Sequence, residues 1–100
     1  MISEKRAFEL IQDTVSNMGQ EGLLSEEIVI RPDTLLQGKG AAFDSLAFVT
    51  LVIDLEVRLN QEINQDVLLK FDDIQAFADD APLTVAVLMR YIVELKLGDT

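Results

Sequence analysis

Apolar residues recur every three or four positions in three separate segments of the chain, 4–18, 45–60 and 84–97. This spacing places them along one face of an α-helix, because an α-helix makes one turn in about 3.6 residues. Two of the segments also begin at a residue that suits a helix N-terminus, since Ser3 precedes the first and Thr84 opens the third. These patterns predict three amphipathic helices.

A weaker pattern predicts a fourth, short helix over residues 72–78, with Asp72 or Asp73 as its cap. Pro82 separates it from the last helix, because the residue before a proline avoids the helical conformation. Gly19 is expected to end the first helix. No segment predicts a sheet, so the fold class is all-α.

One hundred residues correspond to a single domain, 1–100, and 49% apolar with 26% charged residues is a globular composition. The core is expected to consist of the inward faces of the four helices: Ala7, Phe8, Leu10, Ile11, Thr14, Val15 and Met18; Phe48, Leu51, Val52, Leu55 and Leu59; Ile74, Phe77 and Ala78; and Val85, Leu88, Met89, Ile92 and Leu95.

The connection between the first two helices, residues 19–44, is unusually long. Structureless loops beyond about 12–15 residues are uncommon in compact domains unless they serve a function. Residues 28–30 could form a short strand, but no second strand is predicted to pair with it. We therefore expect an ordered loop that crosses a four-helix bundle, held by its own apolar residues: Ile28, Val29, Ile30, Leu35 and Leu36.

The chain is strongly acidic, with a formal net charge of −10. This charge disfavours binding to nucleic acids and to anionic membranes, and it favours partners that present a basic patch. The alternative is that the acidity only keeps a small monomer in solution. No signal peptide or membrane-spanning segment is evident, so a cytoplasmic location is expected.

Ser45 lies where the long loop meets the second helix, directly after Asp44. Either residue could simply cap the helix, or the serine could be exposed so that another protein modifies it. A serine nucleophile needs a base, but the chain has no histidine, and Lys39 lies in a Gly-Lys-Gly loop that offers little to hold it. The chain has no cysteine, and its acidic pairs lack the spacing of a calcium loop. We therefore expect neither an enzyme nor a metal site, and we interpret Ser45 as a substrate.

The chain resembles the acyl carrier proteins and their peptidyl and aminoacyl carrier relatives, from about Arg6 to Leu97. The resemblance depends on Asp44-Ser45-Leu46 at the start of the second helix and on the pattern Leu46-x-x-Val49-x-Leu51-Val52-x-x-Leu55-Glu56 that follows. It also includes Pro32-Asp33-Thr34-Leu35-Leu36 ahead of the serine, and a last helix that begins with Thr84-Val85 and contains Tyr91-Ile92.

In that family the corresponding serine receives 4′-phosphopantetheine from coenzyme A, through a magnesium-dependent phosphopantetheinyl transferase. The thiol of this arm then carries acyl or aminoacyl groups as thioesters between partner enzymes. The resemblance implies that Ser45 is the attachment site and that Asp44 supports it. The missing cysteine agrees with this, since the cofactor would supply the thiol.

Three features depart from the family pattern. Ala42 occupies the position where many members have glycine, and residues 60–82 form a long stretch for a minimal carrier. The exposed side of the second helix, strongly acidic in fatty-acid carriers, is expected here to hold Ala47, Thr50 and Val57 among Asp54 and Glu56. These departures favour a specialised pathway, such as secondary metabolism or surface-polymer synthesis, over housekeeping fatty-acid synthesis.

Leu46, Ile53 and Val57, with Thr50 beside them, fall on the side of the second helix opposite its core stripe. They could form an exposed patch that binds the enzymes acting on Ser45. Alternatively, the long loop could cover them through Leu35 or Leu36. Two functions follow from the sequence: a phosphopantetheinylated carrier, or a carrier-like helical adaptor that binds partners and is never modified.

Overall fold

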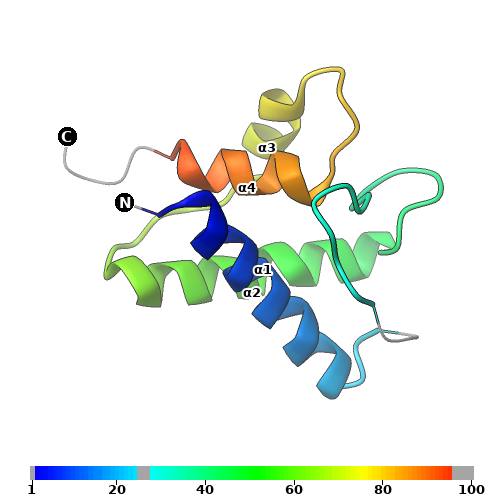
Figure 1. The fold of residues 1–100 in the computed structure, drawn as a ribbon, viewed down its shortest axis with the longest axis horizontal. Coiled ribbons are helices and arrows are strands. Elements are labelled where there is room, and N and C mark those ends of the chain that lie inside the picture. Colours follow the sequence, from blue (N-terminus) through cyan, green and yellow to red (C-terminus); the bar gives the residue numbers. More distant parts are fainter. Residues whose placement is uncertain (1, 25–27, 96–100) are drawn as a thin grey trace.

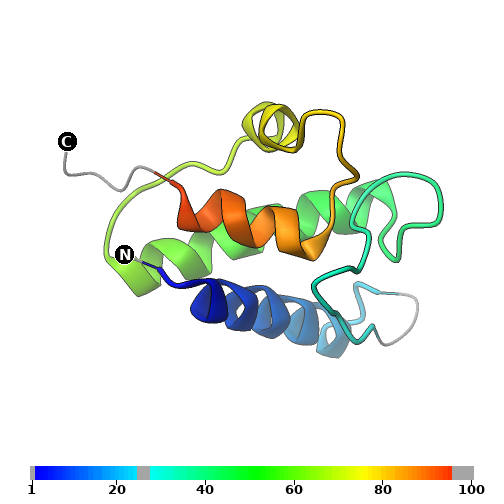
Figure 2. The ribbon, with the colours of Figure 1, turned by 45° about the horizontal axis from the view of Figure 1, so that its top comes forward.

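The structure is a computed structural model that describes residues 2–24 and 28–95. Over these ranges the chain is all-helical, as predicted, with α1 Glu4–Gln20, α2 Ser45–Ile63, α3 Phe71–Ala78 and α4 Val85–Val93. α1 packs against both α2 and α4, whereas the short α3 packs against α4 (Figure 1, Figure 2). None of the helices in the described ranges is long and apolar enough to cross a membrane.

The core lies between these helices and contains most of the predicted stripes. Ile11, Leu51, Leu55 and Leu88 are fully enclosed. Four predicted core residues are only half-buried and pack at the edge: Phe8, Phe77, Met89 and Leu95. Tyr91 lies outside the predicted stripes but is buried, with its ring edge-on to that of Phe77 at a centroid distance of 5.7 Å. This aromatic pair joins α3 to α4.

The first helix begins as predicted but ends later. Ser3 Oγ accepts a hydrogen bond from Arg6 N at 3.1 Å, so Ser3 is the N-cap. Gly19 does not end the helix; Gly22 does, with φ at 77°. Its N–H donates to Gly19 O and the next N–H donates to Met18 O, which is the Schellman arrangement that closes a helix around a left-handed residue.

The second helix continues to Ile63, three residues beyond the predicted end. Asn64 closes it in the left-handed conformation, with φ at 56° and ψ at 45°. The N–H of Gln65 then donates to Asn60 O, so the last turn is closed in the same way as that of α1. Asparagine tolerates this conformation better than most residues, which explains why the helix ends without a glycine.

The predicted limits of the last two helices were also inexact. α3 begins at Phe71 with Lys70 as N-cap, so neither Asp72 nor Asp73 is the cap. Both carboxylates lie in the first turn instead, where the helix dipole stabilises a negative charge. α4 ends at Val93 rather than at residue 97, because its last turn tightens and Leu95 N donates to Ile92 O. Residues 96 and 97 lie outside the described ranges.

The long loop is ordered by three buried residues, Ile30, Leu36 and Phe43. Ile30 and Leu36 were expected as anchors, whereas Phe43 was not. Val29 was expected to anchor the loop but is 76% exposed, and the described part of the 28–30 segment is not a strand. In the described part of the loop, two of the expected anchors are therefore confirmed, and Phe43 is buried whereas Val29 is not.

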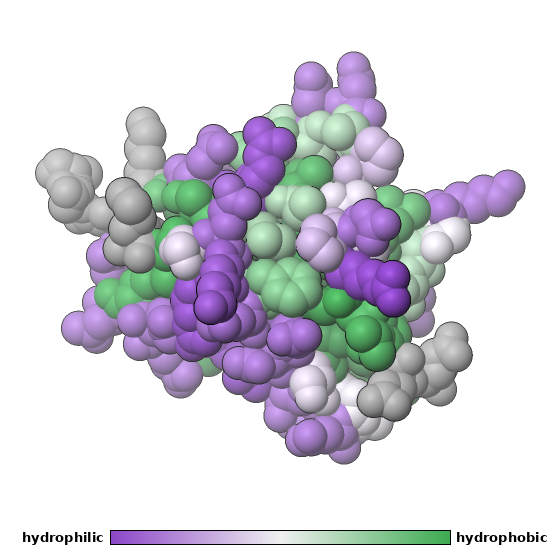
Figure 3. Space-filling view, in the orientation of Figure 1, coloured by the Kyte–Doolittle hydropathy of each residue, from purple (hydrophilic) through white to green (hydrophobic). Residues whose placement is uncertain are grey.

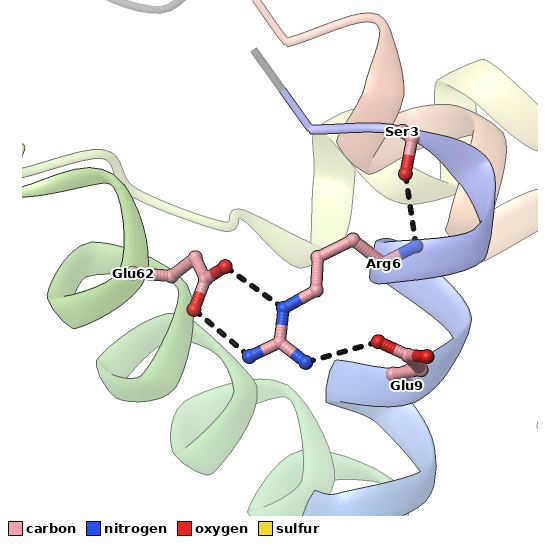
Figure 4. Close-up of polar contacts among 4 residues, drawn as sticks. All are labelled: Ser3, Arg6, Glu9 and Glu62. Carbon is pink, nitrogen blue, oxygen red and sulfur yellow. Dashed lines mark hydrogen bonds and ion pairs between the residues drawn. The ribbon is translucent and has the colours of Figure 1, made fainter.

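Arg6 joins the beginning of α1 to the end of α2 (Figure 4). Its Nε and Nη2 donate to the two carboxylate oxygens of Glu62 at 2.8 and 2.9 Å, and Nη1 donates to Glu9 at 3.1 Å. The hydrogen bonds from Arg6 hold the pKa of the Glu62 carboxyl below its usual value. This contact is partly exposed, so solvent screens it.

The lowered pKa of Glu62 predicts a specific pH dependence. A carboxyl whose pKa is lowered by folding stabilises the protein at pH values above the pKa that it has in the unfolded chain, here 4.5. This stabilisation is lost as the pH falls below 4.5. Glu62→Gln should therefore lower the urea midpoint at neutral pH, and its difference from wild type should shrink below pH 4.5. Glu21→Gln, at the far end of α1, is the control and should show no such convergence. A pH-independent difference for Glu62→Gln would contradict the assignment.

Candidate functional site

Ser45 is the first residue of α2, and its side chain is exposed. The helix is capped by Asp44, whose Oδ1 accepts a hydrogen bond from Ala47 N at 2.8 Å. Ser45 Oγ has no hydrogen bond to any residue that the structure describes. Of the two capping alternatives, Asp44 is therefore the cap, and the hydroxyl of Ser45 remains available.

The loop that leads to Ser45 is bound to the beginning of α4. Leu36 N donates to Leu83 O at 2.8 Å, and Val85 N donates to Thr34 O at 2.9 Å. Leu35 and Thr84 form an isolated antiparallel bridge between these two contacts. These bonds also satisfy part of the backbone N–H groups that a helix N-terminus leaves free. Leu36 and the segment before α4 thus fix the path of the chain toward Ser45.

Between Leu36 and Ser45 the chain makes a tight excursion. Gly38 and Gly40 take positive φ angles of 105° and 85°, which an L side chain rarely adopts. Ala42 N returns to donate to Leu35 O at 3.3 Å. Ala42 does not itself have a positive φ, so this position does not require the glycine found in many carriers.

A pocket of about 510 Å³ opens beside Ser45. Its apolar walls come from the loop, from α2 and from α3: Leu36, Phe43, Phe48, Val49 and Phe71. The rings of Phe48 and Phe71 meet edge-on at a centroid distance of 5.8 Å. The amides of Gln37 and Gln75, hydrogen-bonded to each other, join the loop to α3 at the same pocket. The serine therefore adjoins a partly apolar recess.

The outer side of α2 is exposed and apolar. Leu46 is 76% exposed, Ile53 53% and Val57 51%. The loop does not cover them, because Leu36 points into the core and is fully buried. Thr50 is half-buried, and its hydroxyl donates to Leu46 O at 2.9 Å, so it offers a partner little beyond its methyl group.

Two further residues extend this surface and were missed from the sequence. Val49 is 37% exposed and lines the pocket with Ser45, and Leu68, in the loop after α2, is 66% exposed. The spacing of Val49 from Leu46 and Ile53 could have revealed it, whereas no sequence pattern marks Leu68. We use the term apolar face for the following set: Leu46, Val49, Ile53, Val57 and Leu68.

Two residues expected on the exposed side of α2 lie elsewhere. Ala47 is buried, because it is only about 80° around the helix from Leu55, the centre of the core stripe. Glu56 is half-buried, and its Oε2 accepts a hydrogen bond from Leu69 N at 2.8 Å. Neither residue is therefore a free contact for a partner.

The hydroxyl of Ser45 is accessible, and no side chain in the described ranges is hydrogen-bonded to it as a base. Asp44, its nearest carboxylate in sequence, is engaged with the backbone of α2. The site presents a nucleophile next to a pocket and an apolar face. Comparisons of the chain with family models, with curated proteins and with solved structures found no match, so function must be inferred from these surroundings.

Proposed function

We propose that this chain is a carrier protein of the acyl carrier type, in which Ser45 bears a 4′-phosphopantetheine arm. The observation that supports this most directly is that Asp44, and not Ser45, caps α2. Asp44 caps α2, which leaves the hydroxyl of the exposed Ser45 free for modification. A serine that served only as a cap would have its oxygen bonded to the helix backbone.

The position of Ser45 also suits a phosphodiester. The first turn of a helix has backbone N–H groups without intrahelical partners, and its dipole favours negative charge. Transfer from coenzyme A forms a bond between Ser45 Oγ and phosphorus, breaks the diphosphate bond of coenzyme A and releases adenosine 3′,5′-bisphosphate. The base that accepts the hydroxyl proton belongs to the transferase. When bound, the arm supplies a thiol that this cysteine-free chain lacks and that holds acyl groups as thioesters.

The surroundings of Ser45 support the same function. The pocket beside it has walls from three elements and can shelter part of a group attached to the serine. The apolar face begins at Leu46, the next residue, so an enzyme that reaches Ser45 also meets exposed apolar side chains. The partners are a phosphopantetheinyl transferase and the enzymes that load and unload the arm.

The experiment that tests the proposal is intact-mass measurement after incubation with coenzyme A, Mg²⁺ and a broad-specificity phosphopantetheinyl transferase. The protein should gain the mass of one phosphopantetheine group. An unmodified protein under conditions that load a known carrier would favour the other function, a helical adaptor that binds partners through the apolar face alone.

The apolar face gives a second test of the proposal. Ile53→Glu and Val57→Glu place a charge among exposed apolar side chains, so each should lower the transferase kcat/KM by about tenfold or more, while stability changes by only about 0.5 kcal/mol. Gln12→Glu adds the same charge to the exposed side of α1 and serves as the control. Unfolding of either α2 variant would assign its side chain to the core. Unchanged kinetics in both would place recognition elsewhere.

A further inference from the structure

Exposed large apolar side chains are concentrated on one side of the molecule. Seven are exposed in the described ranges, and five of them make up the apolar face; the other two are Leu23 and Val29, in the loop after α1. Leu46, Val49, Ile53 and Val57 follow one another at steps of three or four along α2, so they form a continuous line. A soluble monomer seldom exposes such a line without a use for it.

Leu68 belongs to this surface because the loop that carries it is bound to α2. Leu69 N donates to Glu56 Oε2 at 2.8 Å. On the other side of Leu68, Val67 N donates to Asn60 Oδ1 at 2.8 Å, and Asn60 Nδ2 donates to Val67 O at 3.1 Å. The two residues that flank Leu68 are thus held one helical turn apart on α2.

These bonds also determine the direction of Leu68. Leu69 is buried at 6% exposure, whereas Leu68, its neighbour, is 66% exposed. The side chain therefore points outward from a backbone that is already fixed. A partner that covers Leu68 does not have to order the loop, which lowers the entropic cost of binding.

The charges next to the apolar face nearly balance: two acidic and two basic side chains cancel, and the two remaining carboxylates, Asp44 and Glu56, are each hydrogen-bonded to a backbone N–H. Asp54 and Arg58 are four residues apart on α2, and Asp66 and Lys70 flank Leu68 in the loop. The carboxylate of Glu56 is already bonded to the backbone. By contrast, one side of α1 is covered by hydrophilic side chains, seen at the lower left of Figure 3. Acidic residues concentrate there and at α3: Glu4, Glu9, Asp13, Glu21, Asp72, Asp73, Asp79 and Asp80. A surface whose charges nearly cancel and whose exposed side chains are apolar suits an uncharged, apolar partner better than a basic one.

Ser45 and the loop that carries Leu68 are close enough for one protein–protein interface to cover both. Glu56 is eleven positions after Ser45 on α2, which is about 16 Å along the helix. A standard interface covers about 800 Å² on each partner, a disc roughly 30 Å across. An enzyme that acts on Ser45 and binds with a standard footprint therefore reaches Leu68 if it extends along the apolar face.

We infer that the transferase that loads Ser45 binds along the whole apolar face as far as Leu68, through an apolar and uncharged surface of its own. This inference rests on the proposed function and specifies how the partner is recognised. Recognition depends on hydrophobic contact, and the net charge of −10 does not drive it. Leu68, 23 residues after Ser45, is then a residue that determines the affinity for the enzyme.

The test is steady-state loading with coenzyme A, Mg²⁺ and the transferase, measured as a function of carrier concentration. Leu68→Ala, Leu68→Glu and Leu68→Lys are compared with the same three changes at Leu23, which is 49% exposed and belongs to the loop after α1 rather than to the apolar face. All three Leu68 variants should raise KM by about fivefold or more and leave kcat within about twofold. The Leu23 variants should match wild type.

The Leu68→Glu and Leu68→Lys variants, which introduce opposite charges, distinguish hydrophobic from electrostatic recognition. If Leu68→Lys lowers KM while Leu68→Glu raises it, docking is electrostatic and the inference is wrong. If no Leu68 variant changes KM although Ser45 is loaded normally, the footprint ends before the loop and the inference is also wrong, while the proposed function stands. If wild-type protein is never loaded, both fail.

Discussion

Ser45→Ala is expected to abolish covalent loading completely while the protein remains folded. The variant removes the only atom that can form the phosphodiester at this position, and Asp44 continues to cap α2 through its bond to Ala47 N. Stability should therefore change by no more than about 0.5 kcal/mol, as for other exposed positions without a structural bond. Intact mass after incubation with transferase, together with a urea titration, measures both effects.

Two comparisons make the assignment of Ser45 specific. Ser16→Ala removes another exposed serine, on α1, and should load like wild type. Asp44→Ala retains the hydroxyl but removes the cap, so it should destabilise the protein by about 1 kcal/mol and slow loading without abolishing it. A phosphopantetheine adduct on Ser45→Ala would show that the attachment site is a different residue.

Leu36→Ala is expected to destabilise the protein strongly although it changes a residue in a loop. Leu36 is fully buried, and its N–H donates to Leu83 O, so the alanine leaves a cavity where the loop meets the beginning of α4. Such deletions cost about 2–5 kcal/mol, a large part of the total of about 5–15 kcal/mol that stabilises a typical domain. Urea unfolding followed by circular dichroism measures this loss.

Leu46→Ala is the matched control because it removes the same atoms from a leucine that is 76% exposed. Its stability should lie within about 0.5 kcal/mol of wild type. Leu36→Ala should in addition lower the rate of loading in the fraction that remains folded, because Leu36 fixes the chain that leads to Ser45. Equal losses of stability in the two variants would contradict the burial of Leu36 and the exposure of Leu46.

The sequence predicted the helices well where their pattern was long. The core stripe of α2 and the caps Ser3 and Thr84 follow from spacing and side-chain chemistry alone, and the structure confirms them. Ends of helices were harder, because they depend on which residue can take a left-handed conformation. For α1 the chain uses Gly22, although Gly19 comes first and looks equally suitable. Only the geometry of the closing hydrogen bonds distinguishes the two glycines.

The candidate site was only partly predictable for a similar reason. Ser45 and Asp44 were found because they are adjacent to a helix start, a local feature. Leu68 was not found, because its exposure depends on Glu56, 13 residues away from Leu69 in the sequence. Periodicity describes one element at a time, whereas Leu68 joins the apolar face through a side chain of α2 that holds the loop.

The bonds between the loop and the beginning of α4 have a consequence for how the protein is made. Thr34 and Leu36 are held by Val85 and Leu83, about 50 residues later in the chain. A ribosome synthesises the chain from its N-terminus, so Ser45 emerges well before the residues that fix the approach to it. During that interval the serine is present without the residues of α4 and its approach that fix the loop, so a transferase that recognises the folded surface does not yet have that surface to bind. On the proposed function, loading of Ser45 should therefore follow the synthesis of α4.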